Sequence, residues 1–389
     1  MNPAPQHRRR ALAGLIAAGS SWRAEWPLPP VLATAGLFIA FGATWLQDAT
    51  RPLWLLAFFL WLFVAILLAA VRVVRHAEAL AVRLGEPYGT LILTLSVTSI
   101  EVLMIAALML HGENNPTLAR DAMFAVVMIV LNGLVGLALI LGALRYHEQA
   151  YNLAGARAYL SVIIPLAVLS LVLPDVTLST PEPTLSVFQS AFLILIALGL
   201  YTTFLLIQTG RHRGYFVENS ATEQNANGEV PAPDEPVVLG STTRHTALLL
   251  LYLALAIVLA ETLAIPVDVG IEVLKLPSAL GGLVVAALVL APEGLGAVRA
   301  ALKNRLQRAV NIAMGSVLAT IGLTVPAVLV ISLVLGHPLE LGLSAADALL
   351  LALTFAVAIL TFSGHRTNVL QGAVHLILFL AYLMLIFAP

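Results

Sequence analysis

Two carboxylates stand inside long apolar stretches of this sequence, where a charge is costly. Glu101 lies in TLILTLSVTSIEVLMIAALML, and Glu293 lies in LGGLVVAALVLAPEGLGAV. A charged side chain at the centre of a bilayer costs about 2.5–3.5 kcal/mol on insertion scales, so such a group needs a partner or a task. Neighbouring hydroxyls can satisfy one such glutamate, but two at matching places predict a shared binding site.

Hydroxyl side chains line up with these carboxylates at helical spacing. The range 90–98 carries a threonine at every fourth position, and Glu101 follows three residues later, on the same helical face. The range 316–324 repeats the spacing of four with one serine and two threonines. We predict five supporting oxygen ligands, which are Thr94, Thr98, Asn132, Ser316 and Thr320.

Glu293 is also surrounded by residues that disturb a helix. Pro292 removes one backbone hydrogen bond, and Gly294 and Gly296 loosen the following turn, so we predict a helix break that exposes carbonyl oxygens. Carboxylate, hydroxyl and carbonyl oxygens suit the metal cations Ca²⁺ and Na⁺, held between Glu101 and Glu293. Burial also favours the protonated carboxyl. A site that binds either protons or a cation is the minimum for an antiporter, and two released protons balance one Ca²⁺.

The elements that must position these residues are membrane-spanning helices. The chain of 389 residues is 60% hydrophobic and 11% charged, whereas soluble domains are about 25% charged. Apolar runs of about 18 residues recur, which predicts an all-α polytopic membrane protein in the lipid bilayer. We expect about eleven transmembrane helices, at 31–47, 52–71, 88–110, 121–143, 158–173, 187–208, 245–264, 278–298, 309–335, 345–362 and 368–387.

The distribution of basic residues predicts the orientation of these helices. All but three of the 20 Lys and Arg residues fall in the N-terminal segment 1–30 or in the connections after every second span. The positive-inside rule therefore places the N-terminus in the cytoplasm and the C-terminus in the periplasm of a bacterial inner membrane. The longest connection, 209–244, is then cytoplasmic, and its acidic part 217–235 is typical of a disordered linker whose role the sequence leaves open.

Apart from the extra helix at 31–47, the spans fall into two groups of five, at 52–208 and 245–387. Because five is odd, the second group starts from the opposite face, which is the geometry of inverted repeats in secondary transporters. An offset of 192 residues aligns Glu101 with Glu293 and Gly89 with Gly281. The repeat motifs extend over 85–133 and 277–326, where MIVLNG of the first corresponds to SVLATIG of the second.

With these residues in view, the chain resembles bacterial calcium/proton antiporters of the cation/Ca²⁺ exchanger superfamily. The resemblance lies in GEPYGTLILTLSVTSIEV (85–102) and APEGLGAVRAALKNRLQRAVNIAMGSVLATIGLTVP (291–326). It implies two inverted five-helix halves, with Glu101 and Glu293 as the paired carboxylates that bind cation or proton. Many members have an asparagine near each repeat glutamate, whereas this chain has Val97-Thr98 and Val289-Leu290 there, so its coordination sphere differs. The resemblance implies exchange of Ca²⁺, or of Na⁺ or K⁺, for protons.

Other classes find less support in the residues. A passive cation channel needs a pore but no competition with protons. An enzyme is not expected, because HExxH, GxSxG and P-loop patterns are absent from the sequence. No cofactor is expected, the net charge of −1 gives no basic field for nucleic acid, and the oligomeric state is left open.

Overall fold

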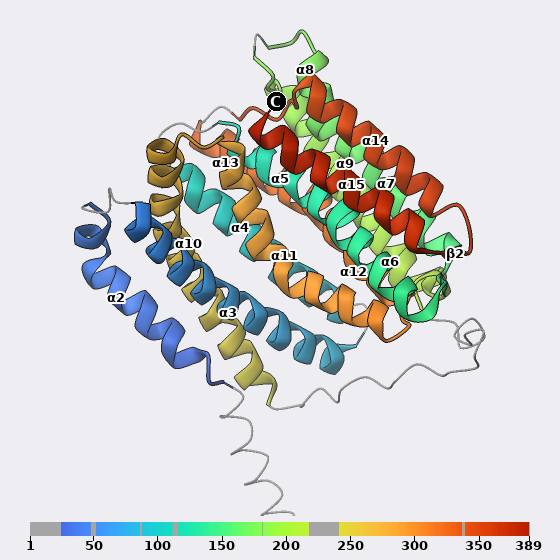
Figure 1. Ribbon diagram of the computed structural model, residues 1–389, viewed down its shortest axis with the longest axis horizontal. Helices are drawn as coiled ribbons and strands as arrows, with labels where there is room; N and C mark the ends of the chain where they lie inside the picture. Colours follow the sequence, from blue (N-terminus) through green and yellow to red (C-terminus); the bar gives the residue numbers. More distant parts are fainter. Residues whose placement is uncertain are drawn as a thin grey trace, which may run out of the picture.

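The computed structural model describes residues 25–47, 52–85, 88–111, 116–180, 182–217, 241–336 and 339–388. Over these ranges the chain is almost entirely helical, with one pair of two-residue strands (Figure 1). Most of the predicted N-terminal segment and residues 218–240 of the predicted acidic linker lie outside the described residues.

The helices fall into two successive groups. The first contains α2 (Leu28–Gln47), α3 (Pro52–Leu84), α4 (Tyr88–His111), α5–η1–α6 (Leu118–Met128, Ile129–Leu134, Val135–Tyr146), α7–η2–α8 (Leu153–Ala167, Val168–Val172, Leu173–Val176) and α9–η3–η4 (Val187–Leu206, Ile207–Arg211, Arg213–Tyr215). The second contains α10 (Thr242–Leu274), α11 (Ala279–Leu302), α12–η5–α13 (Leu306–Ala319, Thr320–Thr324, Val325–Leu335), α14 (Ala345–Thr361) and α15 (Val369–Phe387). The antiparallel strands β1 (Gln149–Ala150) and β2 (Arg366–Thr367) tie the connection after α6 to the connection after α14.

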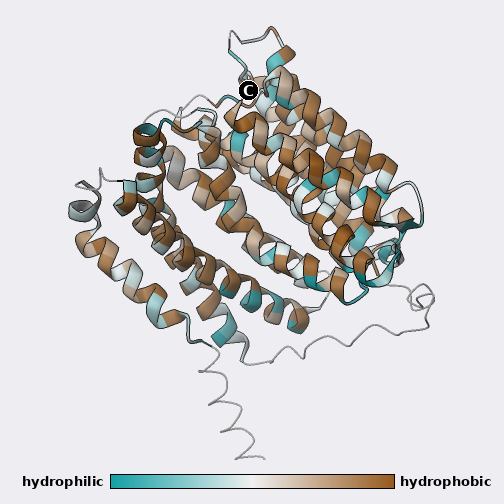
Figure 2. Ribbon diagram, in the orientation of Figure 1, coloured by the Kyte–Doolittle hydropathy of each residue, from teal (hydrophilic) through white to brown (hydrophobic). Residues whose placement is uncertain are grey.

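The predicted class of all-α polytopic membrane protein is confirmed. Among the described residues, eight helical runs are long and apolar enough to cross a membrane, and shorter apolar helices occupy the three remaining predicted positions, at Leu28–Gly42, Leu91–Ala107 and Ala345–Thr361. Hydrophobic residues cover most of each helix, and the hydrophilic ones gather in places such as the connection near β2 (Figure 2). The bundle therefore presents the surface that a bilayer requires.

Several helices continue beyond the predicted spans, above all the first helix in each group of five. α3 and α10 each contain 33 residues, whereas the sequence predicted ends near residues 71 and 264. At 1.5 Å per residue they are about 50 Å long, which exceeds a hydrocarbon core of about 30 Å. Charged residues end an apolar stretch without ending the helix, because the backbone stays hydrogen-bonded. Arg72 and His76 are indeed buried in the helical extension of α3.

The two groups of five are interleaved, and their corresponding members have similar lengths. α3 packs against α10 on one side of the molecule, and α4 and α11 lie between this pair and the larger bundle (Figure 1). α4 and α11 both contain 24 residues, and the runs that follow them contain 29 and 30 residues. These two runs, α5–η1–α6 and α12–η5–α13, are the most deeply buried of the eight membrane-length runs. The inverted orientation of the two groups stays a prediction.

Candidate functional site

Glu101 lies on α4, and its side chain faces the run α12–η5–α13. Its side chain is only 4% exposed. Oε2 accepts hydrogen bonds from Thr320 Oγ1 at 3.0 Å and from Thr324 Oγ1 at 2.8 Å, and both threonines lie in η5. The first predicted carboxylate is therefore buried and held by hydroxyl donors from the other half of the chain.

Glu293 lies on α11, which packs against α12. It is partly buried, and one carboxylate oxygen accepts a hydrogen bond from the hydroxyl of Ser316 on α12. The predicted serine and threonine stripe thus faces both carboxylates. Ser316 donates a hydrogen bond to Glu293. Thr320 and Thr324, one and two turns further on, donate hydrogen bonds to Glu101.

The two carboxylates are close because a single helical run holds both. Ser316 and Thr320 are four residues apart, which is about 6 Å along a helix axis. At such a separation in a poorly solvated region, the charge of one carboxylate acts on the other. Two like charges here repel unless a proton or a cation neutralises them.

Two further oxygens at this place have no hydrogen-bond partner among the described residues. They are Glu101 Oε1 and Thr98 Oγ1, three residues apart on α4 and both buried. A buried polar atom without a partner is costly, and cation coordination is one way to satisfy it. In the part of the chain that is described, no three His, Cys, Asp or Glu residues are grouped as a resident metal site. The geometry is that of two carboxylates with hydroxyl neighbours.

The predicted helix break at Pro292, Gly294 and Gly296 is wrong. α11 is one continuous α-helix from Ala279 to Leu302, with Pro292 inside it. The proline lacks the N–H that would bond the carbonyl four residues earlier, but tertiary packing keeps the helix intact. Gly294 serves close packing instead, because a Cβ atom there would lie 2.8 Å from Leu134 Cδ2 in η1. Gly296 faces Ile312 at an ordinary contact distance.

Two of the four π-helical turns among the described residues lie in the helices near the carboxylates, and the other two, η2 and η3, interrupt the runs that begin with α7 and α9. η1 (Ile129–Leu134) and η5 (Thr320–Thr324) are π-helical turns at corresponding places in the two halves. A π turn replaces the regular i to i+4 bonding and is frequent at functional sites. Thr320 and Thr324 belong to such a turn, so η5 determines how they approach Glu101.

Two of the five predicted supporting ligands have other partners. Asn132 is completely buried, and its amide nitrogen donates to Thr354 Oγ1 at 2.8 Å, while its oxygen lies 3.2 Å from His375 Nδ1. Asn132 therefore faces α14 and α15 and contacts neither carboxylate. Thr94 hydrogen-bonds with Tyr201 of α9. Of the other three, Ser316 and Thr320 contact the carboxylates, and Thr98 lies beside Glu101 without a partner among the described residues.

Sequence reasoning missed two other buried acidic groups. Asp121, at the start of α5, is 7% exposed and pairs with Arg120 at 2.9 Å and Thr117 at 3.0 Å. Glu25 is also 7% exposed and accepts a hydrogen bond from Tyr252. Both lie near the start of a helix, where a charged residue does not interrupt an apolar stretch, so the sequence alone does not distinguish them from exposed loop residues. Their protein partners account for their burial.

The long apolar helices and their packing define the class as polytopic helical membrane proteins. The solved structure of native YfkE superposes on the chain with a TM-score of 0.70 at 18% identity, covering 93% of this chain and 100% of that one. At this identity the likeness shows the fold alone.

Sequence comparisons then establish the family. The family model described as sodium/calcium exchanger protein matches residues 54–210 and 244–388. The chain is 42% identical over 359 residues to the sodium-potassium/proton antiporter ChaA of Escherichia coli, covering 92% of this chain and 95% of that protein. It is 45% identical over 318 residues to the putative ionic transporter y4hA of Sinorhizobium fredii, covering 81% and 84%. A Ca²⁺/H⁺ antiporter of Aphanothece halophytica is 26% identical over 253 residues, covering 61% and 66%.

The chain belongs to the sodium/calcium exchanger family, within the cation/Ca²⁺ exchanger superfamily. It is a multi-span cation transporter and not an enzyme. The predicted class of cation transporter is thereby confirmed.

Proposed function

We propose that this chain is a secondary antiporter that exchanges cytoplasmic cations for protons, with Glu101 and Glu293 as the shared site. The observation that carries the proposal is that both carboxylates accept hydroxyl donors from the same run, α12–η5. Two like charges held this close favour occupancy by protons or by a cation. Proton binding and cation binding then exclude each other, which couples the two flows.

Alternating access follows from the way the two halves share the site. Glu101 belongs to the first half, whereas Thr320 and Thr324 belong to the second. Rocking one half against the other would open the carboxylates to one side of the membrane and then to the other. Basic residues predict a cytoplasmic N-terminus and a periplasmic C-terminus in a bacterial inner membrane, so inward proton flow would drive cation export.

Charge balance supports Ca²⁺ as the exported ion. Two ionised carboxylates carry two negative charges, which one Ca²⁺ or two protons neutralise equally. Carboxylate and hydroxyl oxygens are also hard ligands of the kind that Ca²⁺ prefers. One relative is named a Ca²⁺/H⁺ antiporter.

A second candidate is exchange of Na⁺ or K⁺ for protons at the same site. It is favoured by the 42% identity with a relative named sodium-potassium/proton antiporter over nearly the whole chain. In this case one carboxylate would keep its proton while the other binds the monovalent ion. The partly exposed Glu293 and the buried Glu101 are unequal in a way that suits such a division.

Proton release from acid-loaded inverted membrane vesicles tests the function directly. A fluorescent pH indicator should respond when Ca²⁺, Na⁺ or K⁺ is added, and the ion with the lowest half-saturating concentration is the preferred one. No response to any of the three would contradict the antiporter. Cation flux without proton counterflow would instead identify a channel.

Charge-neutral variants test the site. Glu101→Gln and Glu293→Gln should each abolish the response while the protein still inserts in the membrane. Glu272→Gln removes a carboxylate at the exposed end of α10 and serves as the control with unchanged transport. Native activity in either site variant would remove that residue from the proposal.

A further inference from the structure

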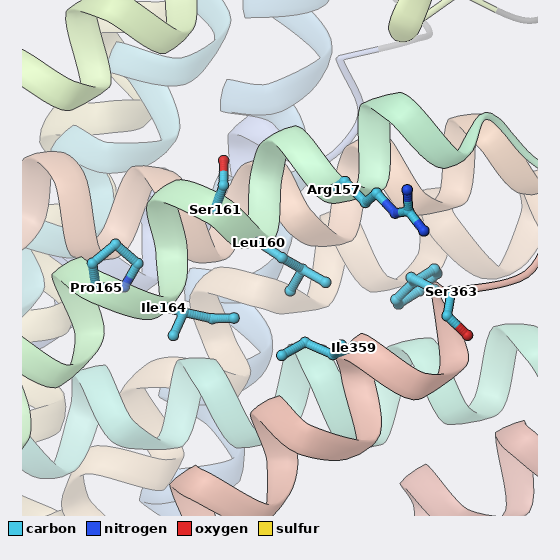
Figure 3. A pocket seen from close by; sticks show the side chains of 8 residues that line it. Arg157, Leu160, Ser161, Ile164, Pro165, Ile359 and Ser363 are labelled. Atoms are coloured by element: carbon cyan, nitrogen blue, oxygen red, sulfur yellow. The ribbon is translucent and has the colours of Figure 1, made fainter.

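A groove on the outside of the bundle separates α7 from α14 and has a volume of about 370 Å³. Its walls are mainly apolar. Leu160 and Ile164 from α7 and Ile359 from α14 point toward one another, and Arg157 extends from α7 toward the end of α14 at Ser363 (Figure 3). The volume lies within the range of small-molecule sites in proteins.

The end of the groove next to Arg157 is rigidly built. Phe362, which lines the groove, packs edge-on against Tyr151, with ring centroids 5.3 Å apart. Tyr151 donates its hydroxyl hydrogen to the carbonyl oxygens at the end of α14, including that of Thr361 at 3.3 Å. Burial raises the pKa of Tyr151 to about 12, so this donor stays neutral. The pairing of β1 with β2 joins the same two connections.

Arg157 carries a charge that no other described residue neutralises. Its side chain is exposed, and no hydrogen bond or ion pair engages it within the described residues. By contrast, Arg366 pairs with Glu148 at 3.3 Å, and Arg145 lies over the ring of Tyr146 at 5.5 Å. Arg157 is thus a cation without a counter-charge at one end of an apolar groove.

We propose that this groove binds an anionic phospholipid, with an acyl chain between α7 and α14 and the phosphate against Arg157. The outer face of α14 exposes large apolar side chains such as Leu353, Ile359 and Leu360, so the groove opens toward the bilayer. Arg157 is among the basic residues that the positive-inside rule places in the cytoplasm. Basic pockets between transmembrane helices on that side bind anionic headgroups. The proposal does not depend on which ion is transported.

Native mass spectrometry of the purified full-length protein in detergent tests this site. The probes are phosphatidylglycerol and phosphatidylcholine with identical acyl chains. The native protein should retain phosphatidylglycerol preferentially, and Arg157→Gln should weaken its binding about five-fold, the factor expected for one basic contact with an anionic lipid. Arg145→Gln, which removes the same charge at the same end outside the groove, should leave binding unchanged.

A second variant separates the groove from the charge. Ile359→Trp should fill the groove and weaken binding of both lipids while leaving cation-driven proton release intact. Equal binding by the native protein and Arg157→Gln overturns the proposal, as does an equal loss in Arg145→Gln. Displacement of the lipid by inorganic phosphate would identify a soluble anion instead. Dimers that bind no lipid would show that a second copy covers the groove.

Discussion

Replacing Thr324 with valine tests whether the hydroxyls of η5 stabilise the ionised form of Glu101. Thr324 is completely buried, and its Oγ1 donates to Glu101 Oε2 at 2.8 Å. Valine keeps the branching and nearly the volume but removes the donor, so that oxygen keeps only the bond from Thr320. A hydrogen bond to a charged group contributes about 1.5–3 kcal/mol.

That loss acts on the ionised carboxylate far more than on the protonated one, so at the proposed site protons would compete more strongly with the cation. Because one pH unit corresponds to about 1.4 kcal/mol, we expect the activity profile of Thr324→Val to move toward alkaline pH by about one to two units. At a fixed neutral pH, the half-saturating cation concentration should rise about ten-fold or more.

The assay is cation-driven proton release from vesicles, measured across neutral and alkaline pH for the native protein and the variant. Thr354→Val is the matched control, since Thr354 is also completely buried and takes part in a bond of 2.8 Å, but with Asn132 instead of a carboxylate. An unchanged pH profile in Thr324→Val would refute the reasoning. An equal shift in Thr354→Val would show that general packing, and not the bond to Glu101, sets the profile.

Three further substitutions have defined outcomes. Gly294→Ala brings a Cβ atom to 2.8 Å from Leu134 Cδ2, and the strain is partly offset by the gain in helix propensity of about 1 kcal/mol, so unfolding in detergent should show a net loss of at most about 2 kcal/mol. A clear gain in stability would mean that Leu134 moves freely. Pro292→Ala adds a backbone donor within a continuous helix, so its melting temperature should equal or exceed the native value, and a clear decrease would contradict the helical assignment. His375→Leu leaves the Asn132 amide oxygen without its partner and should lower the free energy of unfolding by about 1–3 kcal/mol. An unchanged melting temperature would show that this contact between α15 and η1 does not stabilise the protein.

The two carboxylates were predictable because they break the rule that membrane-spanning stretches are free of charge, and the hydroxyl stripe was predictable from its spacing. Glu101 and Glu293 are charges in apolar helices, and the offset of 192 residues relates one to the other. The spacing of four in 316–324 needs only helical periodicity to place three hydroxyls on one face. Once that helix packs between the two carboxylates, the observed bonds follow.

Asn132 and Pro292 show what a single sequence does not contain. An amide in an apolar helix can face any neighbour, and here α14 and α15 supply Thr354 and His375 from more than 200 residues away in the chain. Proline weakens a helix locally, but packing on both sides of α11 outweighs that preference. The π turns η1 and η5 likewise depend on tertiary contacts, since ordinary residues such as Ile129 and Ile321 form them.

The sharing of one helical run between the two carboxylates has a consequence for coupling. Ser316 serves Glu293 within the second half, whereas Thr320 and Thr324 serve Glu101 across the boundary between the halves. In the proposed mechanism, displacement of one half against the other would therefore change the donors of Glu101, and with them its preference for a proton or a cation. By the same linkage, occupancy of the proposed site would change which arrangement of the halves is stable. An exchanger needs this reciprocity, because a motion independent of occupancy would let the site return empty and dissipate the gradient.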